Sequence, residues 1–140
     1  MNIDFIGSMP FENDLIENKI IPIFMFILGL GIFIIWITDI LRGKFNGQGN
    51  FFKWREGENM LWPHFFAEFI TGGLLIIGAA GLFFIIEWSQ NISLVGLGAL
   101  IYSSINSSGW VLAEKIRIYY GIPMWIGLTG SIIAVIWLII

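Results

Sequence analysis

The chain has 140 residues, of which 57% are hydrophobic and only 12% are charged, and this excludes an ordinary soluble domain. It has no cysteine, which excludes disulfides, iron–sulfur clusters and thiolate zinc sites. The formal net charge of −3 gives no indication of nucleic-acid binding.

Most of the hydrophobic residues lie in four long stretches separated by short charged connectors. A helix needs about 20 mainly apolar residues to cross a hydrocarbon core about 30 Å thick. Backbone amides in lipid must be bonded within the segment, and the stretches do not alternate polar and apolar residues, so we expect helices rather than strands. The predicted spans lie near residues 20–41, 61–86, 92–113 and 122–140.

The sequence therefore predicts an all-α, polytopic membrane protein, a bundle of four transmembrane helices. Residues 20–140 are predicted to form one transmembrane domain, and residues 1–19, which mix apolar and acidic side chains, to lie as a lead-in on the outer surface. A partner-docking arm is the alternative for the lead-in.

Orientation is predicted from the basic residues. Six of the seven Lys and Arg residues lie in the connectors 42–60 and 114–121, and only Lys19 lies on the opposite side. Because cytoplasmic loops carry the excess of Lys and Arg, both connectors are predicted to be cytoplasmic. Both termini are then extracytoplasmic in a protein of the cell membrane.

The first connector contains a segment in which aromatic and basic residues alternate. Rings of this kind lie at the acyl boundary, while cations meet anionic headgroups. We expect lipid anchoring here, with docking of another protein as the alternative. The segment consists of Phe51, Phe52, Lys53, Trp54 and Arg55.

The second predicted span carries a carboxylate, Glu68, about two turns from its inner boundary. A charged group in the hydrocarbon costs about 2.5–3.5 kcal/mol at a helix centre and less near the interface. His64 precedes it by four residues and shares its side of the helix. Small residues also share one face of this span, which lets a neighbouring helix approach closely; they are Ala67, Thr71, Gly78 and Gly81.

The third predicted span is the least lipid-like. Small and polar residues recur at spacings of three and four, which predicts a helix-packing seam of Gly96, Ala99, Ser103, Asn106 and Trp110. The short polar connector 87–91 makes the second and third spans antiparallel neighbours. Counted from their inner ends, Glu68 and Asn106 are then expected at similar depth.

One polar constellation combines residues of these two spans. A carboxylate that faces a cavity can bind and release protons, or hold a small cation or polar ligand with nearby hydroxyls. Alternatively, its hydrogen bonds fasten the bundle, at about 0.6 kcal/mol each, or contact another subunit. The predicted residues are Glu68, His64, Asn106, Ser103, Ser107 and Thr71.

No metal site or cofactor is predicted. His64 and Glu68 have the spacing of metal ligands on a helix, but two ligands are too few. Neither a glycine-rich phosphate loop nor a serine–histidine–acid order is present, so the chain is not expected to be an enzyme.

The preferred functional prediction is a non-catalytic accessory subunit of a larger membrane assembly. The expected partners are the lipid bilayer and other membrane subunits or further copies of the chain. The alternative is an oligomeric transporter or channel for protons, ions or small ligands that uses Glu68.

Overall fold

The computed structural model describes residues 17–41, 61–113 and 118–140, which form four α-helices with no strand among them. The helices are α1 (Glu17–Leu41), α2 (Leu61–Phe83), α3 (Ser89–Ala113) and α4 (Ile118–Ile139). The all-α, four-helix part of the prediction is confirmed for these residues. The largest difference in bounds is at α4, which begins four residues before the predicted 122.

Several parts of the sequence prediction lie outside the described residues. These are residues 1–16 of the lead-in, the aromatic and basic segment 51–55 in the first connector, and the loop 114–117. The side chains of Asp39 and His64 also lie outside them, although both residues are helical.

Three of the described helices contain a stretch that is long and apolar enough to cross a membrane. These stretches are Lys19–Thr38 in α1, Phe65–Phe83 in α2 and Gly121–Ile139 in α4. α3 is long enough, with 25 residues, but its serine, asparagine and glycine residues make it less apolar than the other three helices. Membrane crossing stays a prediction for all four helices, and α3 fits it least well.

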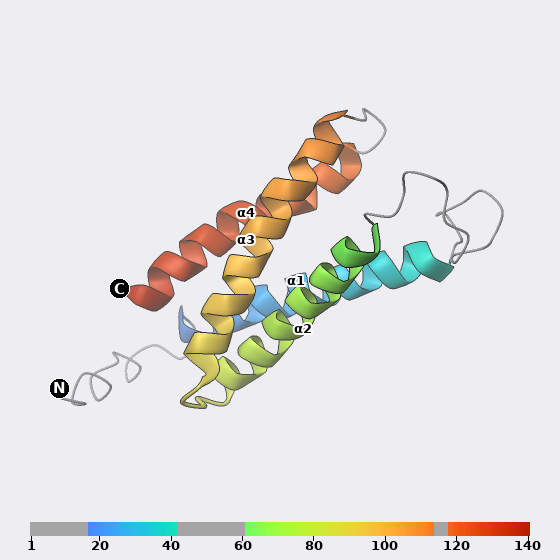
Figure 1. The fold of residues 1–140 in the computed structure, drawn as a ribbon. Coiled ribbons are helices and arrows are strands. Elements are labelled where there is room, and N and C mark those ends of the chain that lie inside the picture. The colour runs from blue at the N-terminus through green and yellow to red at the C-terminus, as the bar shows by residue number, and fades with distance from the viewer. Residues whose placement is uncertain (1–16, 42–60, 114–117) are drawn as a thin grey trace.

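Successive helices run antiparallel and contact one another in chain order (Figure 1). The ammonium group of Lys19 at the start of α1 lies 4.9 Å from the ring centroid of Phe83 at the end of α2. Gln90 Nε2, at the start of α3, donates a hydrogen bond of 2.6 Å to the carbonyl of Leu138 near the end of α4. These contacts gather the start of α1, the α2–α3 connection and the end of α4 at one end of the molecule, here called the hairpin end.

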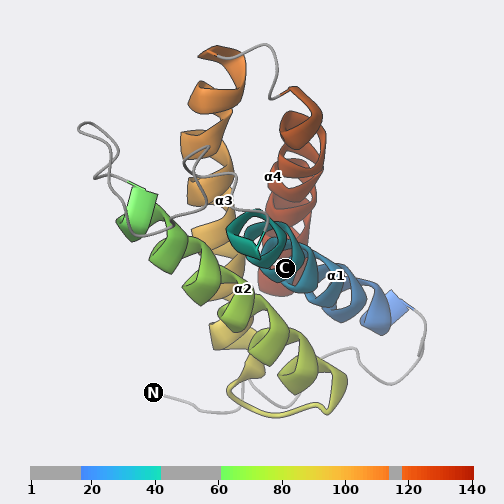
Figure 2. The same cartoon turned by 90° about the vertical axis from the view of Figure 1, so that its right-hand side faces the viewer.

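The helices are close together at the hairpin end and diverge toward the other end. Figures 1 and 2 show α2 and α3 separating along their length, each with its outer neighbour, α1 or α4, beside it. The buried apolar core lies in the half of each helix nearest the hairpin end, and consists of Met25, Leu75, Ala79, Leu97, Leu100 and Ala134. The opposite end is here called the open end. There the buried ring of Phe65 on α2 packs against the ring of Trp36 on α1, with 4.5 Å between the ring centroids.

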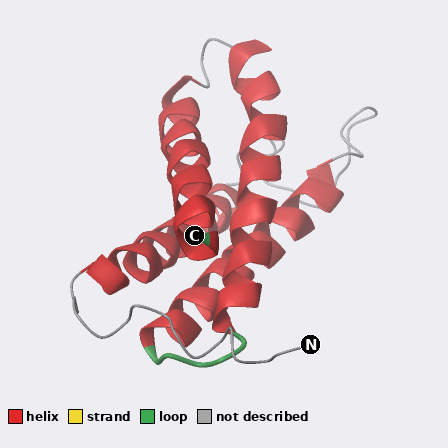
Figure 3. Ribbon diagram, turned by 90° about the vertical axis from the view of Figure 1, so that its left-hand side faces the viewer, coloured by secondary structure: helices red, strands yellow, loops and turns green. Residues whose placement is uncertain are grey.

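A tight turn joins α2 to α3, the green loop in Figure 3. The N–H of Ile86 donates to the carbonyl of Gly81 (2.9 Å) and that of Ile85 to the carbonyl of Leu82 (3.2 Å). This pair of hydrogen bonds is the Schellman motif that ends many helices. Ile85 has a φ of 55°, in the left-handed region that disfavours β-branched residues. The turn fixes α2 and α3 as the antiparallel neighbours that the sequence predicts.

The small-residue face of α2 lies against α3. A Cβ atom added to Gly78 would lie 2.7 Å from Ser93 Oγ, and one added to Gly81 would lie 2.6 Å from Ser89 Cβ. From the other side, a Cβ on Gly96 would lie 3.2 Å from the backbone of Leu74. The two backbones therefore approach closely near the hairpin end, as small residues allow in lipid.

Glycine also sets the distance between α1 and α2. A Cβ on Gly29 would lie 2.7 Å from Ile76 Cγ1 and 2.9 Å from the carbonyl oxygen of Gly72. The carbonyl belongs to the backbone of α2 and cannot rotate away. At Gly31, also on α1, an added Cβ would meet no atom within 4 Å.

This pair of glycines gives a matched test of the fold. We expect Gly29→Ala to lower the free energy of unfolding by about 1–3 kcal/mol, because α1 and α2 must move apart. Gly31→Ala is expected to raise it by up to about 1 kcal/mol through helix propensity alone. Denaturant unfolding in detergent micelles, followed by circular dichroism, measures both. Equal effects of the two substitutions would contradict this helix packing.

Candidate functional site

Glu68 is buried between α2 and α3, toward the open end. Only 7% of its surface is exposed, although it lies in the apolar stretch of α2. Ser103 Oγ, on α3, donates a hydrogen bond to Glu68 Oε1. A hydrogen bond to a carboxyl group offsets part of the cost of removing it from water. The carboxyl group of α2 is therefore shielded by the neighbouring helix of the hairpin.

Thr71 lies one turn after Glu68 on the same face of α2 and is buried as well. Its hydroxyl donates a hydrogen bond of 2.7 Å to the carbonyl of Ala67 on its own helix. This local bond satisfies the hydroxyl hydrogen without a partner on α3. Thr71 therefore lines the same cavity as Glu68 with its hydroxyl hydrogen already bonded to its own helix.

A cavity of about 300 Å³ lies between α2 and α3 at this point. Four of the six residues that the sequence predicted for the polar constellation line it, and its aliphatic lining comes from both helices. Four of the lining residues are exposed and form its rim, namely Ala67, Ile70, Tyr102 and Asn106. The lining residues are Ala67, Glu68, Ile70, Thr71, Ala99, Tyr102, Ser103 and Asn106.

The structure refines the predicted meeting of Glu68 with Asn106. Both residues line the cavity, but the hydrogen bond recorded there comes from Ser103, three residues before Asn106 on α3. α3 moves away from α2 toward the open end (Figure 1). Asn106 is exposed, whereas Ser103 is half-buried. The helix divergence, rather than depth alone, decides which residue contacts the carboxyl group.

Two other predicted residues are placed differently. Ser107 is half-buried on α3 and is not among the residues that line the cavity. The side chain of His64 lies outside the described residues. In the described part of the chain, no group of three or more His, Asp or Glu residues is arranged to hold a metal ion.

Sequence reasoning missed Tyr102, which is 73% exposed and stands at the cavity rim. The helical spacing could have indicated that Tyr102 faces the same side as the predicted seam. It follows Ala99 by three residues and precedes Asn106 by four. It was not singled out because an aromatic residue in a membrane helix does not by itself indicate a site.

A second polar contact joins α3 to α4 at the open end. Trp125 Nε1 donates a hydrogen bond of 3.2 Å to Ser108 Oγ, which in turn donates to the carbonyl of Ser104 at 2.7 Å. Farther toward the hairpin end, Ser93 and Ser131 are fully buried, and their hydroxyl oxygens have no hydrogen-bond partner among the described residues. The serines of α3 thus contact both of its neighbours, and the polar character of this helix serves packing as well as the cavity.

Residues 15–140 match the family described as Domain of unknown function (DUF8058). The chain belongs to this family. The match covers all four helices and every residue that lines the cavity. No curated protein and no solved structure matches the chain. Family membership therefore brings no activity with it, and function has to be argued from the geometry.

Removing the hydroxyl that contacts Glu68 tests the site. We expect Ser103→Ala to lower the free energy of unfolding by about 1 kcal/mol, because the buried carboxyl group loses a hydrogen-bond donor. The control is Ser107→Ala on the same helix, for which we expect a change within about 0.5 kcal/mol. Unfolding in lipid–detergent micelles measures both variants. If the two variants have equal free energies of unfolding, the hydrogen bond between Ser103 and Glu68 contributes nothing to stability.

Proposed function

We propose that the chain is an integral membrane protein without catalytic activity that serves as an accessory or interaction subunit of a larger membrane assembly. The observation that carries this proposal is the exposed side of α3. This surface, here called the outer face of α3, consists of Asn91, Val95, Gly98, Tyr102, Ile105, Asn106, Gly109 and Leu112.

The outer face of α3 is poorly suited to contact lipid. It contains two asparagine amides, and a Cβ atom added to Gly98 or Gly109 would meet no atom within 4 Å. In membranes, polar groups and small residues are concentrated where helices meet, because amides need partners and small residues allow close approach. This supports a further helix, from another subunit or another copy of the chain, that covers the face.

The exposed surfaces of α1 and α4 differ in character. Large aliphatic side chains point outward from both helices, including Ile27 and Ile34 on α1 and Ile133 and Ile136 on α4. Such surfaces are stable in hydrocarbon without a protein partner. The proposal therefore assigns lipid contact mainly to α1 and α4, and protein contact to α3.

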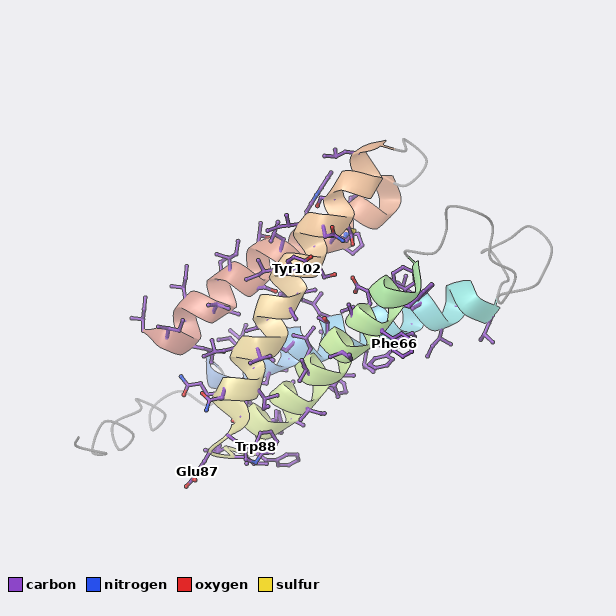
Figure 4. The ribbon with its side chains drawn as sticks, viewed as in Figure 1. Phe66, Glu87, Trp88 and Tyr102 are labelled. Carbon is purple, nitrogen blue, oxygen red and sulfur yellow. The ribbon has the colours of Figure 1, made fainter. Side chains whose placement is uncertain are left out.

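The proposed orientation places the hairpin end outside the cell membrane, with both termini extracytoplasmic. Supporting it, six of the seven Lys and Arg residues occur in the connectors that follow α1 and α3, at the open end. Glu87 marks the hairpin end, in the exposed turn after α2 (Figure 4).

Cysteine labelling tests this orientation, since the chain has no cysteine of its own. We expect Glu87→Cys to react with a membrane-impermeant maleimide in intact cells, because the proposed topology exposes the turn to the outside. The labelled fraction, measured by gel shift, should not rise when the membrane is opened. Labelling only after the cells are permeabilised would reverse the proposed orientation.

A bulky residue on the outer face of α3 tests the interaction role. We do not expect Gly98→Leu to lower the stability of the single chain, because a Cβ atom added there would meet no atom within 4 Å. It should nevertheless reduce association by about tenfold or more, since the partner helix can no longer approach closely. The measurement is the protein mass of the complex extracted from native membranes in mild detergent, by light scattering.

The matched control is Gly31→Leu, the same substitution at a glycine of α1 whose Cβ would also meet open space. We expect this variant to retain the mass of the wild-type complex. A wild-type protein extracted as a single chain, or equal losses in both variants, would contradict the interaction role. Ion or drug flux in liposomes that Glu68→Gln abolishes would instead favour the transporter alternative, which the cavity beside Glu68 supports.

A further inference from the structure

The exposed residues of α3 form a seam along the whole helix. They follow one another at alternating spacings of four and three, and Asn106 lies beside them. Residues with this spacing stay on one side of a helix, and two such seams pack together as a left-handed pair. The seam, here called the α3 seam, consists of Asn91, Val95, Gly98, Tyr102, Ile105, Gly109 and Leu112.

The spacing alone does not distinguish this seam, because a set of exposed residues on α1 follows the same pattern. Every position of the α1 set is a large aliphatic residue, and its members are Ile20, Ile23, Ile27, Leu30, Ile34, Ile37 and Leu41. Lipid tails are as apolar as these side chains, so lipid can cover the α1 set as well as a helix can. The α3 seam instead contains an amide, two glycines and a tyrosine. This chemistry, rather than the spacing, indicates a protein partner.

The polar groups of the α3 seam are complementary to those of a second copy. The seam has no charged residue, so two copies brought together place no like charges against each other. The amide of Asn91 offers both donors and an acceptor, and two such amides that meet can therefore bond to each other. An asparagine within a helix-packing seam also fixes the register of the pair.

The sizes of the side chains are complementary as well. Tyr102 is 73% exposed (Figure 4), and it follows Gly98 by one helical turn. A Cβ atom added to Gly98 would meet no atom within 4 Å, so the surface there is open. In a symmetric pair, the open surface at Gly98 of each copy can receive the tyrosine ring of the other, as a knob enters a hole. Twofold symmetry then makes this contact twice.

The membrane gives a second copy the right direction. Copies of one chain have the same distribution of Lys and Arg, which determines how a chain inserts, so all of them are expected to insert the same way round. Two α3 helices that meet in the bilayer therefore run parallel, and their twofold axis is perpendicular to the membrane. A residue close to such an axis meets its own counterpart.

We propose that the partner on the α3 seam is a second copy of this chain, in a parallel pair with twofold symmetry. The proposal rests on the interaction role of α3 and names its partner. Tyr102 and Asn106 belong to the outer face of α3 and also line the cavity between α2 and α3. The second copy therefore lies beside the rim of that cavity.

Disulfide cross-linking in native membranes tests the pairing, since the chain has no cysteine of its own. Two cysteines can be bridged only when their Cα atoms lie within about 7 Å of each other. We expect oxidation to join Val95→Cys to a second chain of the same variant, and Ile105→Cys likewise, because symmetry brings each position to its counterpart. Gel electrophoresis without reductant measures the fraction of linked chains.

The matched controls are Ile27→Cys and Ile34→Cys, which lie in the α1 set with the same spacing and are each 62% exposed. We expect each α3 variant to give about fivefold more linked chains than either control, because lipid rather than protein covers the α1 set. Light scattering of the purified wild-type chain in mild detergent is the second measurement. We expect a protein mass of two chains, and a shift to single chains in Gly98→Leu.

The proposal is overturned if either α3 variant links no better than the α1 controls, or if the purified wild-type chain has the mass of one chain. Circular dichroism checks the folding of each variant, and the wild-type mass decides should a variant fail to fold. A complex from native membranes that loses mass in Gly98→Leu, without linking between α3 variants, has a different protein as the partner. That result rejects the pairing and keeps the interaction role, whereas a single wild-type chain from native membranes rejects both.

Discussion

A buried carboxyl group on an apolar helix needs a polar partner, and in this protein the neighbouring helix of a tight hairpin provides one. The carboxyl group is that of Glu68, and Ser103 on α3 donates the hydrogen bond to it. The remaining features follow from this requirement. α3 must carry hydroxyls and small side chains on the side that faces α2, so it is less apolar than α1, α2 and α4. The short turn around Ile85 then holds the two helices in register.

The same polar helix also shapes the rest of the molecule. Close glycine contacts bring α2 and α3 together at the hairpin end, and the main cluster of buried apolar side chains lies in the same half of the molecule. The resulting divergence forms the cavity beside Glu68 and leaves the outer face of α3 uncovered by α2 or α4. The proposal of a partner helix on that face follows from the polar character of α3.

The sequence predicted the four helices because their apolar runs are long and contain very few charged residues. It also predicted that Glu68 and Ser103 share an interface, since the short connector makes the two helices neighbours and the small residues recur at helical spacing. It did not predict which residue of α3 contacts the carboxyl group, or the place of Tyr102 at the rim. Those depend on the divergence of α2 from α3, which is set by side-chain volumes and backbone approach along the whole interface, not by periodicity.

The central claim is that α3 shields Glu68 in the bilayer, and solid-state NMR of the protein in lipid tests it most directly. With the carboxyl carbon of glutamate and Cβ of serine labelled, the account predicts a through-space correlation between Glu68 and Ser103 that disappears in Ser103→Ala. It predicts no strong transfer of magnetisation to Glu68 from the lipid acyl chains. Strong transfer from the acyl chains, without the correlation to Ser103, would show that the carboxyl group faces lipid and would contradict the account.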